Sequence, residues 1–337
     1  MTSLVTETVP GSRIALMTMS FESSEPHIER LVHELIAAAK RGVHVYLLVD
    51  AMAFATDQYE LPIGPTLLLH KAASSRRPYF RQKYLLLEEL RDSGGHYHII
   101  NFPKRRLANP YAGRSHIKIA VIDNWVFSGG CNLGSEQIDY MTRLQDPTVA
   151  DWLYELVIRV TEDGNVGHVL QYQDHEFNID DRTTLLVDAG KPKQSLIYES
   201  ALDFIDSAQE WLVMTCQFFP NTVTARHLAA AVKRGVNVTL YYNHPKHHAV
   251  HMKPIQHAVI WVEKTRQPRV LFTHQLPKSL QRLHAKLIAS EQGAIIGSHN
   301  YVTHGVNFGT AEIAIRRYDP AFAHEALSLL KPHLPAQ

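Results

Sequence analysis

The sequence contains few cysteines and no long apolar run. Its 337 residues include only two cysteines, Cys131 and Cys216, so no disulfide framework is expected. No stretch of about eighteen apolar residues occurs, which argues against a transmembrane helix. The N-terminus also lacks the basic start and apolar core of a signal peptide. We therefore expect the protein in the cytoplasm or peripheral on the inner face of a membrane.

An excess of charge of either sign is also missing. The chain has 34 Lys and Arg residues against 33 Asp and Glu residues, a formal net charge of +1. This balance argues against a bulk binder of polyanions, although local basic patches remain possible. The hydrophobic fraction of 45% is ordinary for a folded protein, and the length is sufficient for two domains.

The chain contains an internal duplication. Residues 29–50 describe an amphipathic helix, a stop at glycine and then a buried strand, and residues 225–242 repeat this design. Both helices end at Lys-Arg-Gly, with glycine suited to a left-handed helix cap. Two helix–strand units of this kind predict an α/β fold.

A second repeated segment carries polar residues on a strand pattern. Residues 116–132, HIKIAVIDNWVFSGGCN, match residues 284–300, HAKLIASEQGAIIGSHN. The period of two places each His and Lys on the same face of a strand. The matched pairs are His116 with His284, Lys118 with Lys286, Asp123 with Glu291, Gly129 with Gly297, Gly130 with Ser298, and Asn132 with Asn300.

A third similarity follows each copy. Residues 155–159, ELVIR, match residues 312–316, EIAIR, and we interpret both as strand-like. The first half carries an insertion over residues 51–90 that we expect to shape substrate entry, and it lacks the strand and helix that lead the second half. Charged residues, Gly and Pro gather near 176–194, so we predict halves at 1–178 and 179–337.

These residue types suit phosphoryl transfer if the two halves pack with pseudo-two-fold symmetry. One neutral imidazole can attack phosphorus while a protonated one gives its proton to the leaving oxygen. The two lysines would hold the phosphoryl oxygens, together with Asn132, Asn300, Gly130 and Ser298. Glu155 and Glu312 would each accept a proton from a histidine and so orient it. No metal or other cofactor is needed, since the lysines supply positive charge, and a monomer contains a complete site.

The paired pattern resembles the phospholipase D superfamily over residues 13–318. The stretch RVTEDGNVGHVLQ (159–171) is similar to the branch of bacterial cardiolipin synthases and phosphatidyltransferases. This resemblance implies two homologous α/β/α sandwich halves with the active site at their interface. It further implies a metal-independent reaction through a covalent phosphohistidine, with His116 as nucleophile and His284 as general acid. Asp123 and Glu291 would be supporting catalytic acids, Glu291 being longer than the usual Asp.

Three classes of function remain open. The first is a phospholipase D or phosphatidyltransferase acting on glycerophospholipids, with the apolar stretch 61–69 touching a membrane. The second is a nuclease of the same superfamily, and the third is a binding protein built on a decayed enzyme. Basic residues before both motifs would attract any phosphodiester and do not separate lipid from nucleic acid. They are Lys104, Arg105, Arg106 and Arg114 in the first half, and Lys264, Arg266, Arg269, Lys278 and Arg282 in the second.

Overall fold

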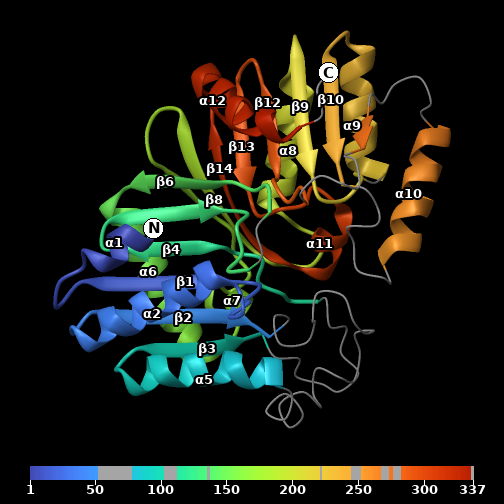
Figure 1. Ribbon diagram of the computed structural model, residues 1–337. Coiled ribbons are helices and arrows are strands. Elements are labelled where there is room, and N and C mark those ends of the chain that lie inside the picture. The colour runs from blue at the N-terminus through green and yellow to red at the C-terminus, as the bar shows by residue number, and fades with distance from the viewer. Residues whose placement is uncertain are drawn as a thin grey trace.

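The computed structural model describes residues 1–51, 78–101, 112–134, 137–220, 222–243, 252–266, 273–275 and 282–334. Its strands form two mixed sheets that are seen one above the other in Figure 1, with the first half below and the second half above. Most of the insertion expected to shape substrate entry lies outside the described residues, and so does the apolar stretch 61–69.

The first sheet has six strands in the order β3-β2-β1-β4-β5-β6. The strands β1, β2 and β3 are parallel, and β4, β5 and β6 continue the sheet in antiparallel pairs. The strands are β1 (Arg13–Thr18), β2 (His44–Asp50), β3 (His96–Ile100), β4 (Ile119–Ile122), β5 (Trp125–Gly129) and β6 (Met141–Gln145). The helices of this half are α1 (Thr2–Thr6), α2 (Pro26–Lys40), α5 (Pro78–Asp92), α6 (Pro147–Asp163) and α7 (Val166–Val169).

The second sheet repeats this order and adds two strands at one edge. Its order is β11-β10-β9-β12-β13-β14-β8-β7, of which the first six correspond one by one to the strands of the first sheet. The strands are β7 (His175–Asn178), β8 (Thr183–Ala189), β9 (Trp211–Cys216), β10 (Asn237–Tyr242), β11 (Thr273–Gln275), β12 (Leu287–Ser290), β13 (Gly293–Gly297) and β14 (Ala311–Arg317). The helices are α8 (Leu196–Ser207), α9 (Thr222–Lys233), α10 (Met252–Arg266), α11 (Thr303–Phe308) and α12 (Pro320–Leu330), followed by the short 3-10 helix η3 (Lys331–His333).

The expected α/β fold with two homologous halves is therefore confirmed. The leading strand and helix of the second half are β8 and α8. The described residues of the first half contain no counterpart of β8, but the short helix α1 precedes β1 as α8 precedes β9, so the expectation that the first half lacks the helix is wrong. Arg41 donates to Val5 O of α1 just as Arg234 donates to Ile205 O of α8. The predicted division at 178/179 falls between β7 and β8, which pair with each other in the second sheet. In terms of sheets, the change from one half to the other comes earlier, between α7 and β7.

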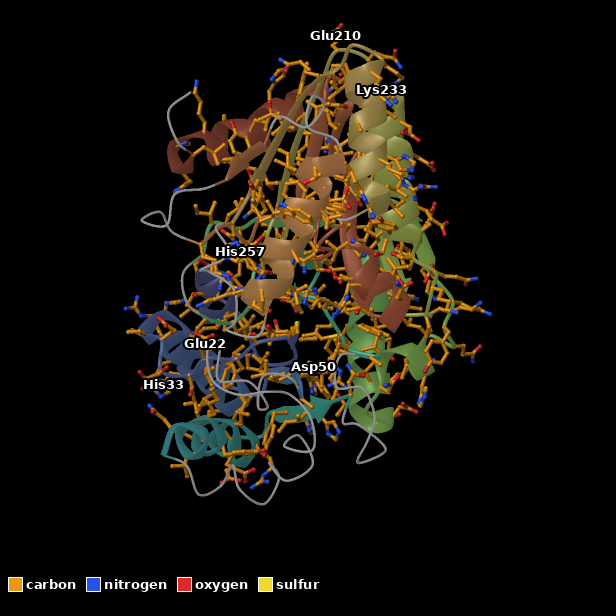
Figure 2. All side chains as sticks on the ribbon, turned by 90° about the vertical axis from the view of Figure 1, so that its right-hand side faces the viewer. Glu22, His33, Asp50, Glu210, Lys233 and His257 are labelled. Atoms are coloured by element: carbon orange, nitrogen blue, oxygen red, sulfur yellow. The ribbon has the colours of Figure 1, made fainter. Side chains whose placement is uncertain are left out.

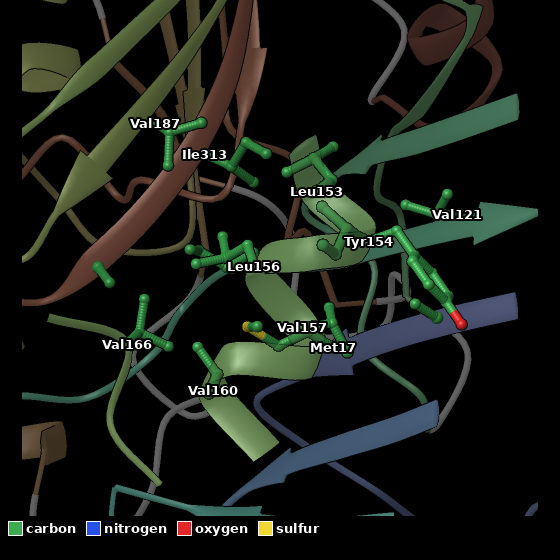
Figure 3. Close-up of a cluster of buried hydrophobic side chains, with 14 of the residues drawn as sticks. Met17, Val121, Leu153, Tyr154, Leu156, Val157, Val160, Val166, Val187 and Ile313 are labelled. Atoms are coloured by element: carbon green, nitrogen blue, oxygen red, sulfur yellow. The ribbon is translucent and has the colours of Figure 1, made fainter. Parts of the chain in front are cut away.

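Helix α6 lies between the two sheets and forms the core that joins them (Figure 3). Its buried apolar residues recur every three or four positions, so they form one face of the helix. This cluster includes Met17 and Val121 from the first sheet and Val187 and Ile313 from the second. The α6 residues in it are Val149, Ala150, Leu153, Tyr154, Leu156, Val157 and Val160. Each buried leucine or valine contributes about 1.5–3 kcal/mol, so this helix fixes how the halves sit together.

Corresponding helices begin with the same local sequence in both halves. Helix α6 follows Asp146-Pro147 and helix α12 follows Asp319-Pro320. The side chain of Asp146 accepts a hydrogen bond from Val149 N, and that of Asp319 accepts one from Ala321 N. Aspartate satisfies a free N–H of the first turn, and proline at the first position has no N–H to satisfy.

No helix among the described residues is long and apolar enough to cross a bilayer.

Candidate active site

The His116 segment is held against the opposite half of the chain. Ser115, which precedes the histidine, forms an isolated β-bridge with Ala311 at the start of β14. The backbone N–H of His116 donates to Ala311 O (2.7 Å), and Ala311 N donates to Arg114 O (2.9 Å). The first motif is therefore aligned with a strand of the second sheet.

The second motif makes the reciprocal contact. Leu283, which precedes His284, forms an isolated bridge with Ile138, which stands just before β6 of the first half. The N–H of His284 donates to Ile138 O (2.8 Å), and Ile138 N donates to Arg282 O (3.0 Å). The pseudo-two-fold relation between the halves thus extends to individual backbone bonds.

These bridges place a carboxylate of each half beside the motif histidine of the other half. Ala311 is followed by Glu312, whose Oε1 lies 3.1 Å from Nδ1 of His116. Ile138 is followed by Asp139, whose Oδ2 lies 2.5 Å from Nδ1 of His284. A carboxylate on Nδ1 fixes the orientation of the ring and leaves Nε2 for chemistry. Each histidine is therefore oriented by a residue from the other half.

Asp139, rather than Glu155, is the counterpart of Glu312. Asp139 lies two residues before Met141, which pairs with Gly129, and Glu312 lies two residues before Ala314, which pairs with Gly297. The strand-like interpretation of residues 155–159 is wrong, because they belong to helix α6, where the side chain of Glu155 is exposed. The helical spacing that buries Leu153 and Leu156 turns Glu155 toward solvent, so it does not orient a histidine.

The site lies at the interface, with both lysines fully buried. Lys118 Nζ donates to the carbonyl oxygen of His116 (2.8 Å), and Lys286 Nζ donates likewise to His284. Burial lowers the pKa of Lys118 to about 8. Burial also lowers the pKa of Lys286 to about 7, and the charge of Lys118 adds to this effect against the attraction of Asp139. Two ammonium groups close enough to repel one another form a site that favours an anion.

The histidines and their carboxylates respond to the same environment. Burial lowers the pKa of His116, although Glu312 opposes this, and burial together with Lys286 lowers the pKa of His284 to about 3. Burial alone would raise the pKa of Glu312, but His116, His299 and Lys118 together outweigh it and lower the value to about 2. Burial likewise opposes ionisation of Asp139, yet Lys286 and His284 hold its pKa below the usual range. Both carboxylates are therefore charged and both imidazoles neutral in the empty site at pH 7.

Gly130 and Ser298 position carboxylates instead of binding phosphate. Ser298 is fully buried; its hydroxyl donates to Glu312 and accepts from Ile313 N (3.0 Å). Gly130 N donates to Tyr140 O (2.9 Å), and Ser298 N donates to Ile313 O (2.8 Å). A Cβ at Gly130 would stand 2.2 Å from Asp139 Oδ1, so glycine makes room for this carboxylate. Since these donors are already used, the predicted phosphate-binding role of both residues is wrong.

Asp123 and Glu291 are also structural rather than catalytic. They occupy the β4–β5 and β12–β13 turns, at the far ends of β4 and β12 from the lysines. At about 3.3 Å per residue, five residues separate Asp123 from Lys118 by roughly 15 Å. Asp123 accepts hydrogen bonds from Arg13 N (3.0 Å) and Ser12 Oγ (3.1 Å) at the start of β1. Glu291 accepts from Gln209, Glu210 and Trp211 N–H groups at the start of β9.

The two asparagines follow the motif strands as expected. Asn132 Oδ1 accepts a hydrogen bond from Ser20 N (3.3 Å), which leaves its NH₂ group as a donor. The Oδ1 atom of Asn300 is buried without a hydrogen-bond partner. Contact of either amide with phosphate stays a prediction.

Two residues that the sequence analysis missed support the segments before the histidines. Asp50, at the end of β2, accepts from Ser115 N (2.9 Å) and pairs with Arg114 (3.2 Å). Asn243, just after β10, accepts from Leu283 N (2.9 Å). Arg114 is therefore a buried structural cation and not part of a basic cleft mouth.

The other basic residues and any metal site are described only in part. Arg266 is exposed on α10, whereas residues 104–106, 269 and 278 lie outside the described residues, as does the side chain of Lys264. Within the described part of the chain, no group of three or more His, Cys, Asp and Glu side chains is arranged to hold a metal ion.

Comparison with known proteins identifies a family. The model of the PLD-like domain of cardiolipin synthase matches residues 8–155 and 201–332, which is most of the chain. The relatives that match include cardiolipin synthase A of Yersinia pseudotuberculosis and of Yersinia pestis, each 22% identical over 240 residues. That match covers 63% of this chain and 43% of each relative, so this chain spans less than half of the relatives it matches.

Solved structures share the fold. Phosphatidylserine synthase from Haemophilus influenzae superposes with a TM-score of 0.70 at 13% identity, covering 100% of this chain and 84% of the other. Polyphosphate kinase from Porphyromonas gingivalis gives 0.57 at 15% identity over 99% of this chain and 48% of the other. Identities this low show a common fold and do not assign a substrate.

Asp139→Asn and Asp123→Asn should separate catalysis from stability. We expect Asp139→Asn to lower turnover of a chromogenic phosphodiester by about a thousandfold or more, because a neutral amide cannot stabilise the protonated form of His284 as the carboxylate does. Asp123→Asn should leave turnover within about threefold and lower the free energy of unfolding by about 1–2 kcal/mol. Turnover and urea unfolding of both variants test this. Equal turnover in the two variants would contradict the assignment of Asp139.

Proposed function

Because the chain belongs to the family of phospholipase D-like domains found in cardiolipin synthase, we propose that it cleaves or transfers the phosphodiester of glycerophospholipids. The reaction proceeds through a covalent phosphohistidine and uses no metal ion. The acceptor is water in hydrolysis, or glycerol or a second lipid in transfer.

One observation carries this proposal: each motif histidine is paired with a carboxylate from the opposite half. Glu312 holds His116 and Asp139 holds His284, with Lys118 and Lys286 buried beside them. Two oriented imidazoles can act in succession as nucleophile and as acid. The lysines supply fixed positive charge for the phosphoryl oxygens in a site from which water is largely excluded.

The first step forms a bond from His116 Nε2 to phosphorus. The phosphorus–oxygen bond to the headgroup alcohol breaks, and its electron pair leaves with that oxygen. His284, protonated on Nε2, gives its proton to the departing oxygen and becomes neutral. His116 is assigned as nucleophile from the family resemblance, and its greater exposure, 15% of the side chain against 7% for His284, agrees with access for attack.

The second step reverses these roles. The acceptor alcohol or water gives its proton to neutral His284 and attacks phosphorus, and the nitrogen–phosphorus bond to His116 breaks. Lys118 and Lys286 each keep further N–H donors beyond the one used on a carbonyl oxygen, so they can hold the phosphoryl oxygens throughout.

Substrate binding itself supplies the protonated histidine that the first step needs. Burial and the lysines keep both imidazoles neutral in the empty site. An anionic phosphodiester beside Nε2 offsets the lysine charges and raises the pKa of one imidazole. Carboxylates on Nδ1 stabilise the resulting imidazolium. The acid is therefore charged only when there is a bond to cleave.

Incubation with phospholipid and with plasmid DNA tests the substrate. We expect release or exchange of the headgroup from phosphatidylglycerol or phosphatidylethanolamine, measured with and without added glycerol. His116→Ala and His284→Ala should both abolish repeated turnover, and a chelator should leave the activity of the wild type unchanged. Cleavage of DNA alone, lost in the same two variants, would replace the lipid assignment with a nuclease.

Trapping the covalent intermediate tests the roles of the histidines. With phosphate-labelled substrate, His284→Ala should retain a labelled enzyme, because attack remains possible while proton transfer to the leaving or from the incoming group is slowed. His116→Ala should give no label. Labelling in His116→Ala and none in His284→Ala would reverse the assignment.

The buried lysines predict loss of activity at alkaline pH. The pKa values of about 7 for Lys286 and about 8 for Lys118 mean that the charges holding phosphate are lost as the pH rises through this range. If both charges are needed, we expect kcat/KM to fall about tenfold per pH unit above roughly pH 7 and about a hundredfold per unit above roughly pH 8.

Unfolding does not explain such a fall. A lysine whose pKa is lower in the folded than in the unfolded chain makes folding more favourable as the pH rises between these two values. The free energy of unfolding, measured at each pH, should therefore hold steady or increase where activity declines. A flat kcat/KM profile between pH 7 and about 10 would show that neither ammonium is needed.

A further inference from the structure

Helix α10 packs Val259 and Ile260 against the core of the second half and also carries large apolar side chains on its solvent side. Gln256 and Glu263 face inward and are only 6% and 3% exposed. Trp261 is 70% exposed and Ile255 is 51% exposed. A surface helix normally buries its apolar stripe and exposes polar residues on the opposite side. The solvent side of α10 instead carries a second apolar surface, which suits a partner.

The outward face of α10 is continuous along the helix. At 100° per residue, Ala258 and Thr265 lie between the directions of Ile255 and Trp261 and join them into one surface. Pro254 and Ala258 are exposed and Val262 is half-buried, which extends the apolar character. An exposed apolar face with two large side chains marks an interaction surface more strongly than isolated residues do.

The charge around this face has one sign. Arg266 and His257 are exposed and Lys253 is half-buried. The acidic residue of α10, Glu263, is buried and lies 3.9 Å from Arg266. None of the α10 side chains that the structure describes presents a carboxylate to solvent. Tryptophan and isoleucine flanked by cations suit the interface of an anionic bilayer, where indole rings settle at the level of the headgroups.

A short chain of contacts joins α10 to the candidate active site. Thr215 Oγ1 donates to the carbonyl oxygen of Ala285 (3.0 Å), the residue between the motif histidine and lysine of the second half. Four residues later, Phe219 N donates to Gln256 Oε1 of α10 (3.1 Å). Figure 2 shows α10 at the front of the molecule, with His257 labelled beside its lower part, above Glu22. The helix is therefore anchored a few residues from the second motif.

We propose that α10 docks the protein on an anionic phospholipid bilayer, with Trp261 and Ile255 inserted at the headgroup level. This inference rests on the proposed function, because it brings the second motif close to the surface in which a lipid substrate resides. Binding is driven by burial of the two side chains and by attraction between the cations and the lipid headgroups.

Flotation with vesicles tests the docking face. Vesicles of phosphatidylcholine with added phosphatidic acid supply the anionic surface. We expect wild-type protein to float with them, and the double variant Ile255→Ser, Trp261→Ser to bind about tenfold or more weakly. The matched control is Leu329→Ser on α12, where a leucine that is 60% exposed should be replaceable without effect. The fluorescence of wild-type protein should also shift to shorter wavelength on binding.

The outcomes for docking and for the proposed function are distinct. Equal vesicle binding by wild type and the double variant, or no binding by wild type, overturns the docking proposal. Turnover of a short-chain phospholipid below its micelle concentration does not depend on docking, so the double variant should retain it. If vesicle binding is lost in the double variant but no phospholipid is turned over by the wild type, the docking proposal stands and the proposed function is wrong.

Discussion

The pairing of each motif histidine with a carboxylate from the opposite half is the constraint on which the site depends. Two isolated bridges, Ser115 with Ala311 and Ile138 with Leu283, set this pairing. Helix α6 packs against both sheets and so holds the bridges in register. Neither half contains an oriented histidine by itself. Folding of each half and docking of the halves are consequently parts of one requirement for catalysis.

The charge balance of the site follows from that arrangement. Docking buries two lysines and two carboxylates in one volume, where unpaired charges would be costly. Lys286 lies 3.9 Å from Asp139, so each half also partly neutralises the other. Burial nevertheless keeps the pKa of both lysines below the usual value. A phosphodiester, the substrate proposed above, would offset the charges of the lysines.

Much of the fold and the central residues could be predicted from the sequence, because repetition made them visible. The two His-x-Lys motifs stand at fixed spacing just before the equivalent strands β4 and β12, and Glu312 was found from the second copy. Asp139 was missed because seven residues separate it from Asn132, whereas twelve separate Glu312 from Asn300; helix α11 occupies the longer connection. Because ELVIR and EIAIR are similar in sequence, both were predicted to be strand-like, although residues 155–159 are helical.

Spacing alone also could not tell which end of a strand faces the site. Asp123 and Glu291 recur as regularly as the histidines, yet they close turns at the remote ends of β4 and β12. A residue that recurs in both halves can therefore be retained for a structural role as well as for a chemical one. Separating the two required the hydrogen-bond partners of each carboxylate, which the linear sequence does not contain.

The residue beside the histidine-orienting carboxylate differs between the two halves. Gly130 leaves space for Asp139, and Ser298 holds the longer Glu312 by its hydroxyl. Serine at 130 would collide with the aspartate, and glycine at 298 would release the glutamate. Neither member of a pair can change alone without cost. Among proteins that descend from the same duplicated ancestor, glycine at this position should therefore occur together with aspartate, and serine together with glutamate. The two positions of each pair belong to neighbouring strands, so their substitutions should be correlated.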